Sequence, residues 1–176
     1  HDNQGSTTLE IHSSPGGRSV WVDGEKMTRL VDFIGRFPSV TLCSSDLMLL
    51  RGNPSERRRF MDLTLSVVNR DYYTALRDFH RGIVERNRLL KNSGSAAEFS
   101  AFEAEIARHA VRIANYREVG MNTLSEVLCR TYDRIAEADE GPQFSFRPNV
   151  DCHETEAYCR LMHDSRKRDQ VIGATQ

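Results

Sequence analysis

Cysteine is scarce in this chain, and long apolar runs are absent. The four cysteines are far apart and form no C-x-x-C pair, which argues against a disulfide framework and against a zinc ribbon. No apolar run approaches the roughly 18 residues that a membrane-spanning helix needs. The polar opening at residues 1–5 does not resemble a signal peptide. We therefore expect a cytoplasmic protein with reduced thiols and no membrane partner.

Motifs for nucleotide hydrolysis and for nucleophilic catalysis are also missing. The sequence has no run of the form G-x-x-x-x-G-K-[ST], whose backbone N–H groups would hold phosphates. The nearest approach is Gly16-Gly17-Arg18-Ser19, but the adjoining Pro15 makes this stretch more typical of a hairpin turn. No Ser, His and acid triple can be identified from spacing, and residues 44–46 are better explained as a helix N-cap. We expect no catalysis and no bound cofactor in this chain.

One weak metal-site pattern lies near residue 160. Cys159 and His163 are four residues apart, so on a helix they would share a face and could bind an ion together with Cys152. A closed zinc site needs better-formed ligand pairs than these. We therefore favour a buried thiol with surface histidines, and we predict no metal site.

The charges are unevenly distributed along the chain. The formal net charge is −1, and charged residues make up 28% of the sequence, which suits a folded, helix-rich protein rather than a disordered tail. Residues 51–91 contain ten Lys or Arg against five Asp or Glu, a net +5, whereas the remaining residues hold fourteen against twenty, a net −6. A basic segment therefore lies on a mildly acidic background, as expected for a surface that binds an anionic partner.

Period-two alternation predicts a β-hairpin at the start of the chain. Apolar and polar side chains alternate over residues 8–13 and 19–23, on either side of the Pro-Gly-Gly turn. Residues 26–37 carry apolar side chains at helical spacing, and we expect a short strand at residues 39–43.

From Asn53 onward the pattern is helical. Asn53 can cap a helix whose first position is Pro54, and Glu56 can reach back to the cap. We expect a second helix over residues 70–91 and a third that opens with a capping box at residues 95–98. Both carry apolar residues at alternating steps of three and four, and neither can bury this stripe alone. They should therefore pack antiparallel as a helical hairpin.

The last part of the chain predicts a return from this hairpin. An acidic loop at residues 136–142 should end it, and Phe144 with Phe146 indicates a strand. Residues 151–154 form a third capping-box pattern, which predicts a helix through about residue 166.

Two long runs resemble the RecF family of bacterial recombination-mediator ATPases, which is related to the SMC and Rad50 proteins. The family pattern G-x-P-x-x-R-R-x-F-[LM]-D is met from Gly52 to Asp62. A second family pattern is met by Tyr73, Leu76, Phe79, Arg81, Arg86, Asn87, Leu89, Leu90 and Lys91. The likeness runs through most of residues 8–176. The phosphate loop, the signature motif and the Walker B acidic pair of the family are absent, so the resemblance implies the middle part of a larger protein.

This resemblance implies an α+β, mostly α fold with three parts. Residues 1–50 would be a partial segment of an ABC-type ATPase head, residues 51–141 a helical arm, and residues 142–176 a return strand and helix. The intact parent would bind ATP and Mg, form an ATP-dependent homodimer and act as a weak DNA-dependent ATPase. It would bind DNA at single-strand gaps and work with RecR and RecO to load recombinase.

The basic segment supplies the candidate binding residues. Successive helical residues point about 100° apart, so Arg57, Arg58 and Arg59 cannot all face one partner. Arg58 can pair with Asp62 as a structural brace, and Asn87 can bond across the hairpin and fix its register. The candidates for contact with DNA phosphate are Arg57, Arg59, Arg77, Arg81, Arg88 and Lys91. The alternative for the triplet is a structural brace between arm and head, and for the four residues of the second helix it is an ordinary solvated face.

Two functions follow from these observations. The first is a DNA-facing arm of a RecF-like protein, whose arginines contact phosphate. The second is a helical hairpin that binds a partner protein and makes no direct contact with nucleic acid. Salt dependence distinguishes them, because phosphate contacts weaken steeply with salt.

Overall fold

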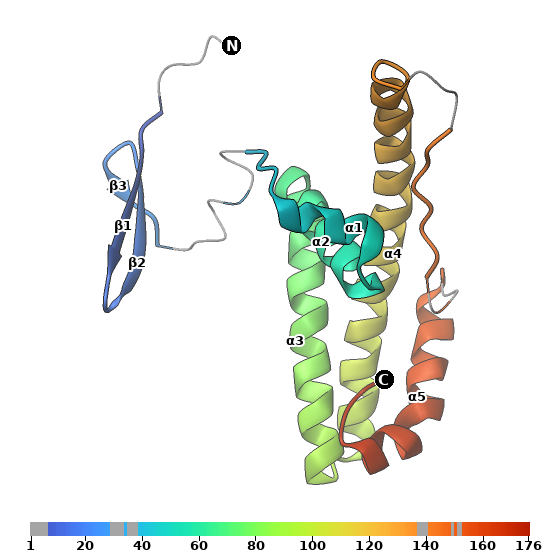
Figure 1. The fold of residues 1–176 in the computed structure, drawn as a ribbon. Helices are drawn as coiled ribbons and strands as arrows, with labels where there is room; N and C mark the ends of the chain where they lie inside the picture. The colour runs from blue at the N-terminus through green and yellow to red at the C-terminus, as the bar shows by residue number, and fades with distance from the viewer. Residues whose placement is uncertain (1–6, 29–33, 35–38, 137–140, 149, 151–152) are drawn as a thin grey trace.

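The computed structural model confirms a mostly α-helical protein with one small antiparallel sheet (Figure 1). In Figure 1 the sheet lies apart from the helices, which pack together as one group. The structure describes residues 7–28, 34, 39–136, 141–148, 150 and 153–176.

The predicted β-hairpin is present and has a third strand. Strand β1 (Leu9–Ser14) pairs antiparallel with β2 (Gly17–Val22), and β2 pairs with β3 (Glu25–Lys26). The Pro-Gly-Gly stretch is a turn, as predicted, with Gly17 at φ 132°. Asp23 and Gly24 both have positive φ, which is the backbone of the two-residue turn that Asp-Gly favours. That dipeptide could have predicted β3 from the sequence.

The strand expected at residues 39–43 is wrong. These residues have no regular secondary structure, and Val40 and Leu42 are 100% and 89% exposed. The backbone N–H of Cys43 donates to the Asp46 carboxylate at 2.8 Å, where it caps a short 3-10 helix, η2 (Ser44–Leu47). The predicted helix at residues 26–37 falls mostly outside the described residues, although Lys26 ends β3.

Three helices form the core. After the short α1 (Met48–Arg51), α2 (Pro54–Val68) leads into α3 (Arg70–Asn92), and α4 (Ala96–Tyr132) returns antiparallel to α3 (Figure 1). The caps at Asn53 and Ser95 are as predicted: Asn53 accepts from Ser55 N, and Ser95 and Glu98 form a capping box. Hydrogen bonds from the backbone and side chain of Ser95 lower the pKa of Glu98, which favours its charged form at the helix start.

The α3–α4 seam is buried, as the apolar periodicity predicted. Buried side chains from three helices share one cluster: Met61, Leu65, Tyr72, Ala75, Ile113 and Met121. Two glycines allow neighbouring helices to approach each other closely. A Cβ on Gly82 would lie 2.6 Å from Ile106, and one on Gly120 would lie 2.4 Å from Leu65.

The return segment differs from the prediction at Phe144–Phe146, where the structure has no strand. Instead of pairing with a strand, Phe144 N donates to Ser125 Oγ of α4 at 2.8 Å, and Ser125 Oγ donates to Phe144 O at 2.9 Å. Helix α5 (Thr155–Ile172) then packs along α4 and α3 and runs past the expected end at residue 166. The predicted capping box at 151–154 begins on residues outside those described. Its described end differs from the prediction, because Glu154 is the N-cap residue of α5 and makes no side-chain cap hydrogen bond.

Across the described residues, the structure contains no helix that is both long and apolar enough to cross a membrane.

Candidate nucleic-acid interface

The four predicted phosphate contacts on α3 share one exposed face. At about 100° per residue, Arg77, Arg81, Arg88 and Lys91 fall within an arc of about 80° and extend about 21 Å along the helix. All four are exposed. We call these residues the basic face of α3. Because α3 is held on its other side by α4, this face is presented on a rigid support.

Two of the four cations of the basic face pair with carboxylates of the same helix. Arg77 forms a bidentate pair with Asp78, from Nε at 2.8 Å and from Nη2 at 3.1 Å, and Arg88 lies 3.9 Å from Glu85. The Arg88–Glu85 pair is exposed, and such a pair contributes little, typically well under 1 kcal/mol, and exchanges readily with solvent. Within the described part of the chain, Arg81 and Lys91 have no carboxylate within 4 Å.

The arginine triplet lies on α2, next to α1. Arg57, Arg58 and Arg59 are all exposed. The guanidinium of Arg57 donates to the carbonyl oxygen of Leu49 at 3.2 Å, which ties α1 to the start of α2. The predicted pair between Arg58 and Asp62 is not among the ion pairs of the described residues, because Asp62 is occupied elsewhere.

Asp62 instead joins a polar cluster that connects α2, α3 and α4. The hydroxyl of Tyr72 donates to Asp62, and Arg117 donates to Asp62 at 2.7 Å and to the Tyr72 oxygen at 3.1 Å. Burial, together with the Asp62 hydrogen bond, raises the pKa of Tyr72 above its ordinary range. Burial opposes the charge of Arg117, but its contacts with Tyr72 and Asp62 outweigh this and raise its pKa. The brace expected at Asp62 therefore exists, with Arg117 as the cation.

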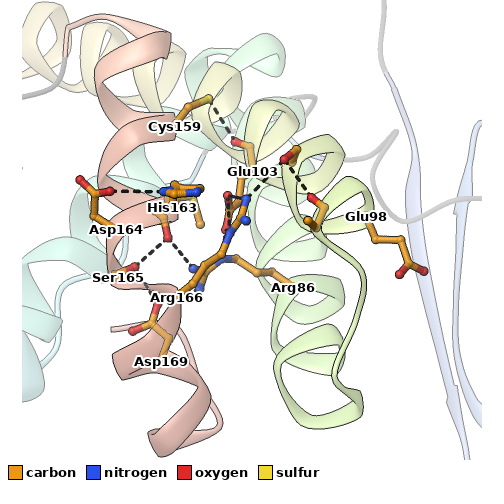
Figure 2. A network of polar contacts seen from close by, with 12 residues as sticks. Arg86, Glu98, Glu103, Cys159, His163, Asp164, Ser165, Arg166 and Asp169 are labelled. Atoms are coloured by element: carbon orange, nitrogen blue, oxygen red, sulfur yellow. Dashed lines mark hydrogen bonds and ion pairs between the residues drawn. The ribbon is translucent and has the colours of Figure 1, made fainter.

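A second polar network lies at the far end of the hairpin, centred on Arg86 (Figure 2). The Arg86 side chain is fully buried. It donates to Glu103 of α4 at 3.0 Å, to Asp169 of α5 at 2.8 Å, and to the carbonyl oxygen of Met162 at 2.8 Å. It also donates to Thr175 Oγ1 at 2.9 Å. One arginine therefore holds α3, α4, α5 and the segment after α5 together.

The charges in this network balance. Arg166 of α5 donates to Glu103 at 2.9 Å, and its guanidinium lies 5.1 Å from the centre of the Phe99 ring. The hydrogen bond with Glu103 raises the pKa of Arg166. The buried Arg86 and the half-buried Arg166 thus face the two buried carboxylates, and the exposed Arg168 lies 3.8 Å from Asp169 on the outside. This pairing is what makes burial of the charged groups tolerable.

Three residues of this network were not predicted from the sequence: Glu103, Arg166 and Asp169. A signal existed for Glu103, because it lies between Phe99 and Ile106 on the apolar stripe of α4, where an unpaired carboxylate would be costly. Arg86 was noted only as part of the RecF-like pattern. For Asp169 we find no comparable signal in the sequence.

Asn87 does not bond across the hairpin as predicted. Its Oδ1 accepts from the backbone N of Thr175 at 2.8 Å and from Thr175 Oγ1 at 2.7 Å. The polar contact across the hairpin is made by Arg86, which donates to Glu103 of α4, and Asn87 anchors the turn that follows α5.

The described residues contain no group of three or more His, Cys, Asp and Glu side chains placed to hold a metal. His163 is exposed beside Asp164, and the thiol of Cys159 lies 3.8 Å from the carbonyl oxygen of Glu103. Burial, with Glu103 and Glu156 nearby, raises the pKa of Cys159, which disfavours the thiolate that would bind a metal. Cys152 lies outside the described residues.

Comparison with known proteins finds RecF proteins of several bacteria among the matches. The chain is 28% identical over 153 residues to the DNA replication and repair protein RecF of Herpetosiphon aurantiacus, covering 84% of this chain and 40% of that protein. It is 27% identical over 168 residues to RecF of Leptospira biflexa, covering 93% and 44%. RecF of Streptococcus thermophilus is 26% identical over 175 residues, covering 96% and 48%. No family model matches the chain.

Solved structures agree with these sequence matches. The recombination mediator protein RecF-ATP in the RecFOR pathway, and its RecF-ATPrS form, each superpose with a TM-score of 0.79 at 21% identity. Each match covers 97% of this chain and 48% of the other. The resemblance in sequence and the shared fold thus extend over nearly the whole chain, which spans about half the length of the proteins it matches. The chain is therefore a relative of the RecF proteins.

Proposed function

We propose that this chain forms the helical arm and adjoining segments of a RecF-like protein that acts in DNA replication and repair. The relatives that it matches carry that name. We assign residues 1–50 to part of an ATPase head, residues 51–141 to the arm, and residues 142–176 to the return towards the head. ATP and Mg would be bound by other parts of the whole protein, because this chain has no phosphate loop.

The basic face of α3 is the observation that carries the DNA-binding role. Four exposed cations on one side of a supported helix can each approach a phosphate oxygen, and arginine does so with a planar fork of donors. Contacts of this kind fix position on a duplex and carry no base preference. Arg57 and Arg59 of α2 extend the cationic surface in this proposal, while Arg58 is left as a brace towards the head.

The proposed partners follow from the resemblance to RecF. They are DNA at junctions of single and double strands, RecR and RecO as mediator proteins, and a second copy of the parent when ATP is bound. In this scheme the intact parent is a weak DNA-dependent ATPase that helps to load recombinase, and the arm contributes to the grip on DNA.

One observation favours a protein-binding role as the second candidate. Leu63 and Val67 are four residues apart on the outer side of α2 and are 59% and 40% exposed, with Val68 at 75%. An apolar strip of this kind suits a protein contact better than phosphate. It lies on α2, so both roles can coexist on different faces of the arm.

The replacement Arg81→Gln tests the DNA-binding role. We expect it to reduce the slope of log Kd against log salt by about 0.9, because one phosphate contact releases about that many counterions. Fluorescence anisotropy of a labelled duplex across a salt series measures the slope.

Arg112→Gln is the matched control, since it removes the same charge from an exposed position on α4, away from the basic face. Its slope should equal that of the unmodified chain. Equal slopes for all three proteins would favour the protein-binding role.

A further inference from the structure

A surface pocket lies at the C-terminal end of the basic face. It has a volume of about 340 Å³ and is lined by Val84, Asn87, Arg88, Lys91 and Asn92 of α3. We call it the Asn87 pocket. Arg88 and Lys91 contribute two cations, and Val84 contributes an apolar wall. Most of the exposed pocket surface is apolar, and the two cations lie among these apolar atoms.

The turn after α5 orients Asn87 at this pocket. Gly173 ends α5 with φ 75°, and a Cβ placed on it would lie 3.9 Å from Lys91 Cε, so the turn lies directly against the pocket rim. Thr175 donates twice to Asn87 Oδ1, from its backbone N and from its hydroxyl. With its acceptor occupied, Asn87 has only its Nδ2 amide, a donor group, to offer to a ligand.

The Thr175 hydroxyl is itself fixed from the other side. It accepts from the buried Arg86 at 2.9 Å and therefore gives its proton to Asn87. A chain of directed hydrogen bonds thus runs from Arg86 through Thr175 to Asn87. The amide, the guanidinium of Arg88 and the ammonium of Lys91 are all donors, and such a set is complementary to an anion with several acceptor oxygens.

We propose that the Asn87 pocket binds a phosphate group, and that Asn87 is the neutral positioning donor within it. This inference rests on the proposed DNA-binding function, because it makes the pocket the place where the basic face holds one backbone phosphate most closely. The terminal carbonyls of α3 carry partial negative charge and oppose an anion here. Lys91, in the last turn, offsets them, so this lysine contributes more than an ordinary surface cation.

Asn87→Asp tests the proposal in the 176-residue chain. The carboxylate keeps an acceptor for both Thr175 hydrogen bonds, so the unfolding temperature should change little, while the donor becomes a negative charge. We expect the Kd for a labelled duplex to rise about tenfold or more, since a hydrogen bond to a charged group is replaced by repulsion. Asn115→Asp, exposed on α4, makes the same charge change away from the pocket and should raise the Kd by no more than about twofold.

Two further measurements separate the outcomes. The first is a titration with inorganic phosphate, in which the NMR signals of the Asn87 side-chain amide report binding in the pocket without DNA. The second uses Lys91→Met, which replaces Asn87→Asp as the test variant if Asn87→Asp does not fold. Amide shifts that saturate with phosphate and are lost in Lys91→Met, without a selective effect on duplex binding, would identify free phosphate as the ligand.

Equal duplex affinities for Asn87→Asp and Asn115→Asp, together with no saturating phosphate shift, would overturn the proposal. The DNA-binding function would still stand if Arg81→Gln lowers the salt slope. If the unmodified chain shows no salt-dependent duplex binding, that function is overturned instead. The phosphate titration alone would then decide whether the Asn87 pocket binds phosphate.

Discussion

Replacing Arg86 with methionine is expected to lower the free energy of unfolding by about 3–5 kcal/mol, the usual cost of breaking a buried ion pair from one side. The cost arises because buried groups around Arg86 would lose their partner. Asp169 is fully buried and would lose its closest cation, while Met162 and Thr175 would lose their donor. Urea unfolding followed by circular dichroism measures the change.

Arg88→Met is the matched control for this experiment. Arg88 lies two residues along α3 and is exposed, and its ion-pair partner among the described residues is Glu85 at 3.9 Å. Its loss should therefore change the stability by less than about 0.5 kcal/mol. The double variant Arg86→Met with Asp169→Leu should recover part of the loss, because Glu103 keeps Arg166 as its cation. An Arg86→Met protein as stable as Arg88→Met would show that the network does not hold α5 in place.

Arg117→Met should give the second large effect, a loss of about 1.5–3 kcal/mol, the range for hydrogen bonds to charged groups. Arg117 is the cation that joins Asp62 of α2 to Tyr72 of α3. Without it, the half-buried Asp62 keeps only the Tyr72 hydroxyl among its side-chain partners in this cluster.

The expected signature is a loosening of α2 before the hairpin opens. Hydrogen exchange should become faster in α2 than in the α3–α4 seam, since α2 depends on this cluster more than the seam does. Arg112→Met, an exposed replacement on the same helix, should leave both exchange and stability unchanged. Uniformly faster exchange in all three helices would contradict the assignment of Arg117 to α2.

The long elements of this fold could be predicted because their signals are local. Helix α3 and the start of α4 were given by apolar spacing and by the cap at Ser95, and the β-hairpin by alternation around its glycine turn. Short apolar runs at residues 39–43 and 144–146 gave wrong strands. A strand needs a partner, and a sequence pattern of a few residues does not show whether one exists.

The polar networks could not be predicted for a related reason. Arg86 meets Asp169 across 83 residues and Thr175 across 89, and no periodicity indicates such pairs. Asp62 and Asn87 were predicted to be structural residues, but with other partners. The predicted partner of Asp62 was Arg58, four residues away, and Asn87 was expected to bond to the facing helix. The actual partners, Arg117 and Thr175, come from elements that only the fold brings near. The phosphate contacts named from the sequence remain predictions.

A variant with Arg77, Arg81, Arg88 and Lys91 all replaced by glutamine tests whether the basic face of α3 binds DNA, through its Kd for a labelled duplex across a salt series. All four are exposed, so the variant should unfold at nearly the same urea concentration as the unmodified chain. If the basic face of α3 holds DNA phosphates, the slope of log Kd against log salt should fall by about 3.6, or about 0.9 for each contact. If the variant folds and its slope equals that of the unmodified chain, the basic face of α3 does not hold DNA phosphates.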